Sequence, residues 1–200
     1  QRQVADALQR LGGFQDVSVR PVLGMEDPWR YRNKGSFPVG YHTNGELAAG
    51  FFAPRSHRII PVEDCPIQQE LVMKIVHAVL DWARACGVPA YEEATHTGLL
   101  RHVMVRAAQD KAMVVVVTTG ELPHPEELIR RLSQLEGVCS IVHNVNRSDS
   151  NVILGDEYHT ICGEERLTVP MMGMEFEASA ASFLQVNPAQ TQVLYRTALD

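Results

Sequence analysis

Apolar side chains recur along this chain with two periods, one typical of helices and one typical of strands. Residues 67–86 place apolar side chains three and four positions apart, and glycine and proline follow as helix terminators. Residues 125–135 repeat this spacing over a shorter length. These segments predict two main helices. Terminal helices are expected over residues 1–11 and from 187–188 onward, where an asparagine N-cap precedes proline.

Short strand-like segments occupy most of the remaining chain. They alternate apolar with polar positions and are bounded by Gly, Pro or Asn. The expected strands cover residues 17–22, 31–39, 47–53, 58–62, 99–107, 113–118, 139–146, 158–162, 166–170 and 174–178. The Asn44-Gly45 step predicts one hairpin, and the turn around Asp110 predicts another.

Together these elements predict an α+β fold. It would contain largely antiparallel, hairpin-rich sheets, two main packed helices and a helix at each terminus. No expected strand is followed by a Gly-rich turn and a helix. A complete Rossmann-like domain, such as a methyltransferase domain, is therefore not expected within these residues.

The composition combines a real hydrophobic core with an acidic balance. Hydrophobic residues make up 45% of the chain, and the formal net charge is -6. This acidity argues against broad, nonspecific binding to phosphates, so any nucleic-acid site has to be a local patch. The apolar run at 113–117 is far shorter than a membrane span, and the first residues carry no export signal. We expect a cytoplasmic monomer that does not contact membranes.

Four cysteines, Cys65, Cys86, Cys139 and Cys162, are widely spaced and form no Cys-x-x-Cys pair. In a cytosolic protein they are not expected to form disulfides, and each taken alone is typical of a small buried apolar residue. A metal protein that uses Cys65 with histidines is one alternative. It is disfavoured because no pair of ligands has suitable spacing.

Residues 29–34 interleave three cations with two aromatic side chains. A strand here would place Arg30, Arg32 and Lys34 on one face and the aromatic rings on the other. Cations beside rings suit a phosphate backbone and an unstacked base. An amphipathic edge strand with a solvated charged face has the same pattern, so both interpretations stay open.

Three further polar segments are candidates for binding. Arg55 and Arg58 flank a turn between two strands, where they either contact phosphates or are simply solvated. In the strand expected over 99–107, alternation places Arg101 on one face and His102 with Arg106 on the other, which also fits an ordinary strand surface.

The third segment places Phe183 and Gln185 just ahead of the last helix. A phenyl ring stacks and an amide reads hydrogen-bonding edges, so the pair suits a ligand contact. A helix cap would have the same composition.

In their order along the chain, these segments resemble the uracil-C5 methyltransferases that act on 23S ribosomal RNA and transfer RNA. The matching segments are 31–34, 37–39, 50–52, 56–58, 64–67, 98–102, 142–146, 151–155 with Tyr158, and 182–187. Each segment is weak alone. Their correct order over nearly the whole chain makes the resemblance specific.

The resemblance implies roles for three positions. Gln185 matches the family glutamine that contacts S-adenosyl-L-methionine, and Phe183 matches an aromatic residue close to the substrate RNA. Cys65 matches the last of four cysteines that hold a [4Fe–4S] cluster in many members. The other three normally precede the matched region, so the cluster would belong to the parent protein and is not expected in this chain. RNA phosphate and sugar contacts are then expected from Arg30, Arg32, Lys34, Arg55, Arg58, Arg101 and Arg106.

The resemblance also implies what these residues lack. The family makes uracil C5 nucleophilic by adding a cysteine thiolate to C6, and a base later removes the C5 proton. That thiolate and the Gly-rich cofactor loop follow the matched segments in the family. The nucleophile is therefore not expected among the four cysteines here.

The leading hypothesis is a central portion of a 23S ribosomal RNA uracil-C5 methyltransferase that is inactive alone, with transfer RNA as the alternative substrate. The expected division is a truncated linker helix (1–14), a central RNA-facing α+β domain (15–180) and the start of the S-adenosylmethionine-dependent domain (181–200). A different hypothesis is a stand-alone RNA-binding or assembly module without catalysis.

Overall fold

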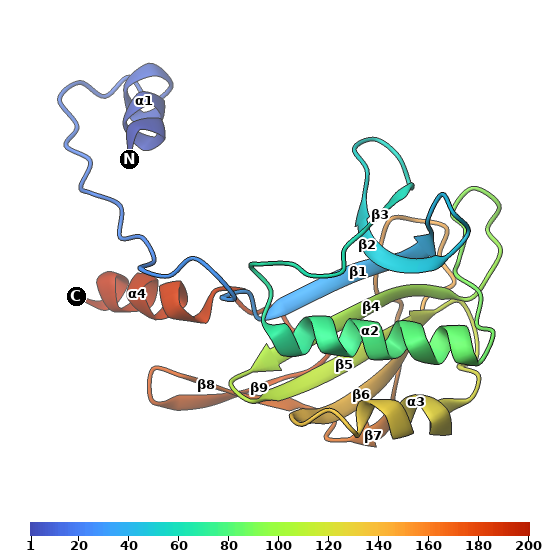
Figure 1. The fold of residues 1–200 in the computed structure, drawn as a ribbon. Helices are drawn as coiled ribbons and strands as arrows, with labels where there is room; N and C mark the ends of the chain where they lie inside the picture. Colours follow the sequence, from blue (N-terminus) through green and yellow to red (C-terminus); the bar gives the residue numbers. More distant parts are fainter.

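The centre of the computed structural model, which describes all of residues 1–200, is a seven-stranded sheet with the order β3-β2-β1-β4-β5-β6-β7 (Figure 1). A two-stranded hairpin, β8-β9, lies outside this sheet. The strands are β1 (Lys34–Tyr41), β2 (Leu47–Phe52), β3 (Ile59–Pro61), β4 (Leu100–Ala108), β5 (Lys111–Thr118), β6 (Val138–Val145), β7 (Glu157–Gly163), β8 (Leu167–Met171) and β9 (Met174–Ala178). The helices are α1 (Arg2–Arg10), α2 (Glu70–Ala85), α3 (Pro125–Leu132) and α4 (Pro188–Leu199).

Neighbouring strands pair antiparallel everywhere except between β5 and β6. Those two are parallel because the chain crosses back through α3 between them, as parallel pairing requires. The α+β class with a largely antiparallel sheet is therefore confirmed, together with two main packed helices and a helix at each end.

Helix α2 lies across one face of the sheet and supplies its main core (Figure 1). The stripe expected from the apolar spacing is buried, with Val72 and Val76 both 0% exposed. It packs against strand residues such as Phe37 in a cluster of 24 buried residues. The indole of Trp82 donates to the carbonyl of His124 at 3.2 Å and ties α2 to the start of α3. This burial fixes the positions of β1 and β4.

The opposite face of the sheet is more polar at its two ends. Side chains that are opposite in register point to the same side, so Lys34 with Arg106, and Pro38 with His102, lie on the face away from α2. The middle of this face is covered by a second cluster of eight buried residues, with Leu167 of β8 among them. Polar side chains therefore remain at both ends of β1 and β4.

The two terminal helices have few contacts with the sheet. Helix α1 stands away from it and buries none of its residues (Figure 1). Helix α4 begins as predicted, because Asn187 Oδ1 accepts the Gln190 amide at 3.0 Å and Pro188 follows in the first turn. Its one buried residue is Thr191. None of the four helices combines the length and apolar character needed to cross a membrane.

Two expected strands differ from the structure. Residues 17–22 form no strand because no neighbouring strand pairs with them, and Val22 is 67% exposed. The strand expected over 31–39 begins only at Lys34, because Arg30 has a left-handed backbone (φ 49°) and Arg32 makes just one isolated bridge. The remaining strands lie within a few residues of the expected ranges.

Candidate nucleic-acid interface

The left-handed backbone of Arg30 overturns the expected alternation of residues 29–34. Arg30 does not continue a face with Lys34. Its guanidinium instead makes two hydrogen bonds of 2.7 Å to Asp64 and one of 2.9 Å to the carbonyl of Cys65. The hydrogen bond from Arg30 lowers the pKa of the Asp64 carboxyl. Arg30 thus fastens the chain before β1 to the turn before α2.

The other two basic side chains of this segment, Arg32 and Lys34, form a group with Arg106 that has no acidic partner. Lys34 lies opposite Arg106 in the β1–β4 ladder, and Arg32 Nε donates to the carbonyl of Lys34 at 3.1 Å. None of the three forms an ion pair. Burial, Arg106 and Arg32 together lower the pKa of Lys34, and burial lowers that of Arg106. We call Arg32, Lys34 and Arg106 the cation cluster; it is a place where an anion would relieve repulsion.

The segment before α4 crosses beside the cation cluster. Arg106 donates to the carbonyl of Ser182, and the Asn33 amide donates to the carbonyl of Val186 at 3.0 Å. Between these two attachments, Phe183 is 84% exposed and Gln185 is also exposed. The open face of this ring is available for stacking on an unpaired base.

Gln185 and Phe183 line a cavity of about 90 Å³ together with Asn33 and Tyr195. Ligand pockets of drug size begin near roughly 300 Å³. The cavity is therefore too small to enclose a whole ligand of the size of S-adenosylmethionine.

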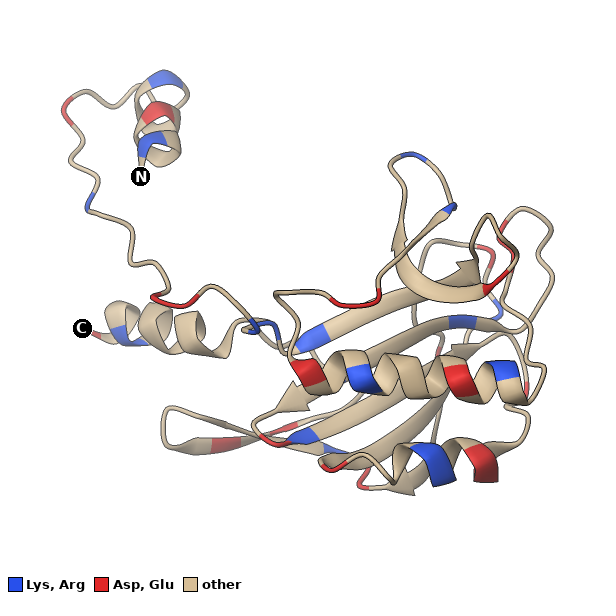
Figure 2. Ribbon diagram, in the orientation of Figure 1, with Lys and Arg blue, Asp and Glu red and all other residues tan.

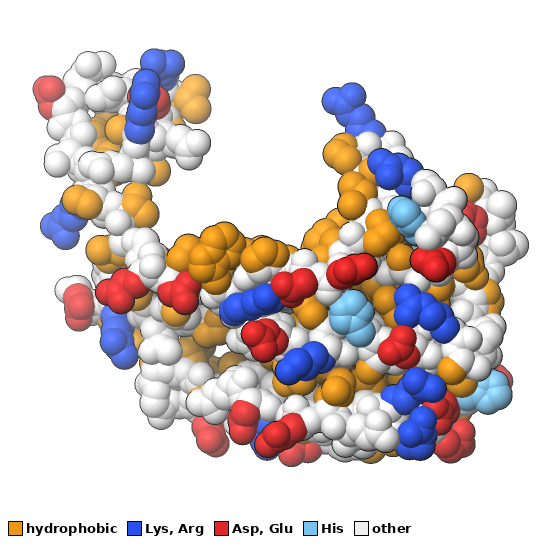
Figure 3. All heavy atoms as spheres, viewed as in Figure 1, with side chains coloured by type: hydrophobic (Ala, Val, Ile, Leu, Met, Phe, Trp, Pro, Cys, Tyr) orange, Lys and Arg blue, Asp and Glu red, His pale blue; other side chains and the backbone are white.

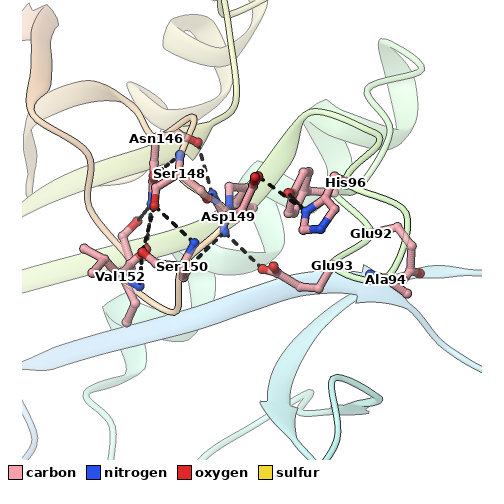
Figure 4. A network of polar contacts seen from close by, with 12 residues as sticks. Glu92, Glu93, Ala94, His96, Asn146, Ser148, Asp149, Ser150 and Val152 are labelled. Carbon is pink, nitrogen blue, oxygen red and sulfur yellow. Dashed lines mark hydrogen bonds and ion pairs between the residues drawn. The ribbon is translucent and has the colours of Figure 1, made fainter.

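Arg101 occupies the other end of the sheet, where its side chain binds residues of two loops, 91–97 and 146–150. Glu93 and Asn146 of these loops are labelled in Figure 4. Its guanidinium donates to the carbonyls of Asn146 and Ser148 at 3.2 and 2.6 Å, and it pairs with Glu93 at 3.2 Å. Its carbon Cζ also lies 4.4 Å from the centroid of the Tyr91 ring. Arg101 is 3% exposed, and both of its terminal guanidinium nitrogens have partners within the protein, whereas Nε has none.

A cavity of about 290 Å³ opens beside Arg101 on the face away from α2. A register irregularity between Leu100 and His102 interrupts the strand alternation, and both Arg101 and His102 line the cavity. The prediction from strand alternation that Arg101 and His102 lie on opposite faces is therefore wrong. Burial and the charge of Arg101 lower the pKa of His102 to about 4, so its ring is neutral near pH 7.

The basic turn at 55–58 lies at the rim of the same end. Arg55 has a left-handed backbone (φ 60°), and both it and Arg58 are exposed. His57, between them, packs edge-on against Phe52 with ring centroids 5.3 Å apart. Figure 2 shows the basic residues of this loop standing clear of the acidic ones. In contrast, the face covered by α2 and α3 mixes both charge signs (Figure 3).

Cys65 lies in the turn that Arg30 fastens, and all four cysteines are free and partly buried. No group of three or more His, Cys, Asp or Glu side chains is placed to hold a metal ion. The residues present therefore do not fit a [4Fe–4S] cluster, and we derive no chemistry from one.

The structure separates the predicted site residues into two groups. Arg32, Lys34, Arg106, Phe183 and Gln185 come together at one end of β1 and β4, with Arg30 just before it. Arg55, Arg58 and Arg101 lie near the other end, at the 290 Å³ cavity or its rim. The sequence analysis did not single out Ser36, Phe52, Glu93 or Asn151, which also line that cavity. Their segments are far apart along the chain, and only Phe52 and Asn151 belonged to matched segments.

No protein-family model matches the chain. Over its full length, however, the chain is homologous to a region of bacterial RNA methyltransferases, and it spans 44% of the length of these relatives. They include proteins named uncharacterized RNA methyltransferase from Halalkalibacterium halodurans (47% identical over 204 residues), Clostridium tetani (46% over 203) and Listeria monocytogenes (42% over 201). The matches cover 99–100% of this chain.

A solved structure shares the fold. It is the crystal structure of Pyrococcus abyssi tRNA (uracil-54, C5)-methyltransferase in complex with S-adenosyl-L-homocysteine. The TM-score is 0.71, and the match covers 86% of this chain and 41% of that chain. Because the sequences are only 21% identical, the likeness concerns the fold alone.

Proposed function

We propose that these residues form the RNA-facing region of an S-adenosylmethionine-dependent RNA uracil-C5 methyltransferase whose substrate is a uridine of 23S ribosomal RNA. The observation that carries the proposal is the cation cluster beside the exposed ring of Phe183. Unpaired cations attract a phosphate backbone, and an open aromatic ring stacks on an extruded base. The homology to RNA methyltransferases supports the choice of RNA as the partner.

The division of labour proposed within the chain follows from its attachments. Residues 15–180 would hold the RNA, and 181–200 would begin the domain that binds the methyl donor, with 1–14 as a linker helix. Gln185 would contact S-adenosylmethionine, which supplies the transferable methyl group when bound. The hydrogen bonds from Arg106 and Asn33 to the segment 182–186 would keep the stacking ring at a fixed height over the cation cluster.

The chain is proposed to be inactive alone because uracil C5 requires a nucleophilic thiolate to add at C6. No cysteine lines the cavity beside Gln185. Burial raises the pKa of Cys139, which opposes the thiolate form at neutral pH. The nucleophile would therefore come from another part of the longer protein.

Methyl transfer is the test. The full reading frame and the 200-residue chain are each incubated with radiolabelled S-adenosylmethionine and 23S ribosomal RNA transcribed without modifications, and with unmodified transfer RNA in parallel. We expect the full-length protein to methylate the ribosomal RNA and the 200-residue chain to show no turnover. In that protein, Phe183→Ala and Gln185→Ala should each lower kcat/KM at least tenfold.

Phe14→Ala and Gln134→Ala are matched controls, because both side chains are exposed away from the cation cluster. They should retain activity. Turnover by the 200 residues alone would contradict the proposed inactivity, and turnover on transfer RNA only would reassign the substrate. RNA binding without any methyl transfer by the full-length protein would favour the stand-alone binding module.

A further inference from the structure

The cavity beside Arg101, at the far end of β1 and β4 from Phe183, has no role in the function proposed above. Its floor is formed by Ser36 and His102, and Phe52 forms a wall. Ser36 lies two positions from Lys34 and His102 lies four positions from Arg106, so the floor begins roughly 7 Å along the sheet from the cation cluster and extends to roughly 13 Å. An RNA chain that spans both ends therefore places different nucleotides at the two places.

Three side chains that line this cavity each carry one buried polar atom without a hydrogen-bond partner. Six buried side-chain atoms lack a partner in the whole chain, and Ser36 Oγ, His102 Nδ1 and Arg101 Nε are three of them. His102 is 7% exposed and Arg101 is 3% exposed, so water does not readily reach these atoms. An unpaired buried polar group is costly. Because three of the six such atoms belong to side chains around this one cavity, the cavity is suited to a ligand that brings hydrogen-bonding groups to them.

The chemistry of the lining selects a neutral, flat, polar ligand. The positive charge of Arg101 is already balanced by Glu93 at 3.2 Å, and His102 is neutral near pH 7, so the cavity does not hold a net charge for a phosphate. Phe52 offers a ring for stacking, and it is 38% exposed. The amide of Asn151 adds a donor and an acceptor. A nucleobase has the matching features: a flat face and an edge of hydrogen-bonding groups.

Cations at the rim supply the complementary contact. Arg55 and Arg58 are exposed on the turn that carries His57, and neither forms an ion pair. A base in the cavity would leave its own phosphate outside, toward this basic turn. At about 290 Å³ the cavity has the size of a small ligand site and not of a longer segment of RNA.

We propose that this cavity binds one unstacked nucleobase of the substrate RNA, distinct from the uracil that is methylated. Ser36, His102 and Asn151 would read the edge of the base, and Phe52 would stack on its face. The inference rests on the proposed function for the identity of the RNA. It adds a second recognition point, which would fix the register of the RNA relative to the methylation site.

The test couples the protein cavity to one RNA position. The full-length protein is titrated with fluorescent single-stranded RNA that contains the target uridine in unmodified form. A series of such RNAs carries one abasic nucleotide at a different position in each. We expect one abasic position other than the target uridine to weaken binding about 5- to 100-fold, the range given by losing one base–aromatic stack. Phe52→Ala should weaken binding similarly, and combining the two changes should cause little further loss.

Two further variants distinguish loss of a cavity contact from loss of folding. Ser36→Ala removes one orphaned atom with almost no change in volume, and it should alter the preference among the four bases at the same RNA position. Phe176→Ala, at a ring 37% exposed on β9 and outside the cavity, is the matched control and should leave the abasic profile unchanged. Thermal melting checks that each variant is folded.

Independent, additive losses for Phe52→Ala at every abasic position would overturn the proposal. Tight, saturable binding of free AMP, GMP, CMP or UMP, weakened by Phe52→Ala and without coupling to any RNA position, would also overturn it in favour of a free nucleotide. Methyl transfer on the same RNA keeps the two ideas apart. Turnover without coupling removes only this cavity's role, and coupling without turnover removes only the proposed activity.

Discussion

Arg101 and Glu93 form an ion pair of 3.2 Å in which the arginine side chain is 2% exposed and the glutamate side chain 18%. The pair joins the loop at 91–97 to the start of β4, and the other donors of Arg101 bind carbonyls of the loop at 146–150. Removal of one member of such a pair leaves the other charge buried without compensation. The two loops that wall the cavity therefore depend on one guanidinium.

Arg101→Ala should lower the free energy of unfolding by about 3–5 kcal/mol, the range for breaking a buried ion pair. Urea denaturation followed by circular dichroism measures it. Arg130→Ala is the matched control, because Arg130 pairs with Glu127 on the exposed surface of α3 and should change stability much less. Equal losses in the two variants would show that the Arg101 network does not stabilise the fold.

His102 should make stability depend on pH. Its pKa in the folded protein is about 4, below its usual value of 6.5, so the unfolded chain binds the proton more tightly. The stabilising contribution is complete above pH 6.5 and is lost as the pH falls toward 4, with a total on the order of 3 kcal/mol. Burial also lowers the pKa of His143, which acts in the same direction.

His102→Gln isolates the contribution of His102, since His143 remains in both proteins. The difference in unfolding free energy between wild type and variant should shrink as the pH is lowered from 7 to 4. A difference in unfolding free energy that stays constant over this range would mean that folding does not lower the pKa of His102.

Lys34→Met should separate stability from binding. The Lys34 ammonium is half-buried beside Arg32 and Arg106 without an acidic partner, so its removal should leave thermal stability equal or higher. RNA affinity should fall, and the slope of log K against log salt should decrease by about 0.7–0.9 if one phosphate contact is lost. Filter binding at several salt concentrations measures both quantities. An unchanged slope would remove Lys34 from the phosphate contacts.

Gly98→Ala should loosen the loop at 91–97. Gly98 has φ +98°, and a Cβ there would lie 2.0 Å from the carbonyl oxygen of Ala90. The strain should cost at least about 1–3 kcal/mol. Gly24→Ala is the control, because Gly24 has open space around it and no left-handed backbone, and it should be neutral or slightly stabilising. Hydrogen exchange of the loop amides would detect the change even if global stability were preserved.

The elements that local patterns govern were predictable from the sequence. The apolar stripe of α2, the β4–β5 hairpin and the cap at Asn187 each depend on residues close together in the chain. The strand expected over 17–22 failed for a non-local reason, since alternation alone does not supply a partner strand.

The state of each basic residue was not predictable, because it depends on residues distant in sequence. Arg30 finds Asp64, 34 residues away, and Arg101 finds carbonyls 45 to 49 residues away. Arg32 and Lys34, although adjacent to Arg30 in the pattern, find no acid. Charge and strand position identify these residues as candidates, and only the tertiary structure tells the paired ones from the unpaired.

The parallel pairing of β5 with β6 has a consequence for synthesis of the chain. As the polypeptide leaves the ribosome, β5 can join β4 through a tight turn, but its other edge stays open until α3 and then β6 have been made. That edge carries the valines 114–117 in succession, a composition prone to association with other chains. We expect translation pauses or chaperone contact to matter most while residues 119–145 emerge.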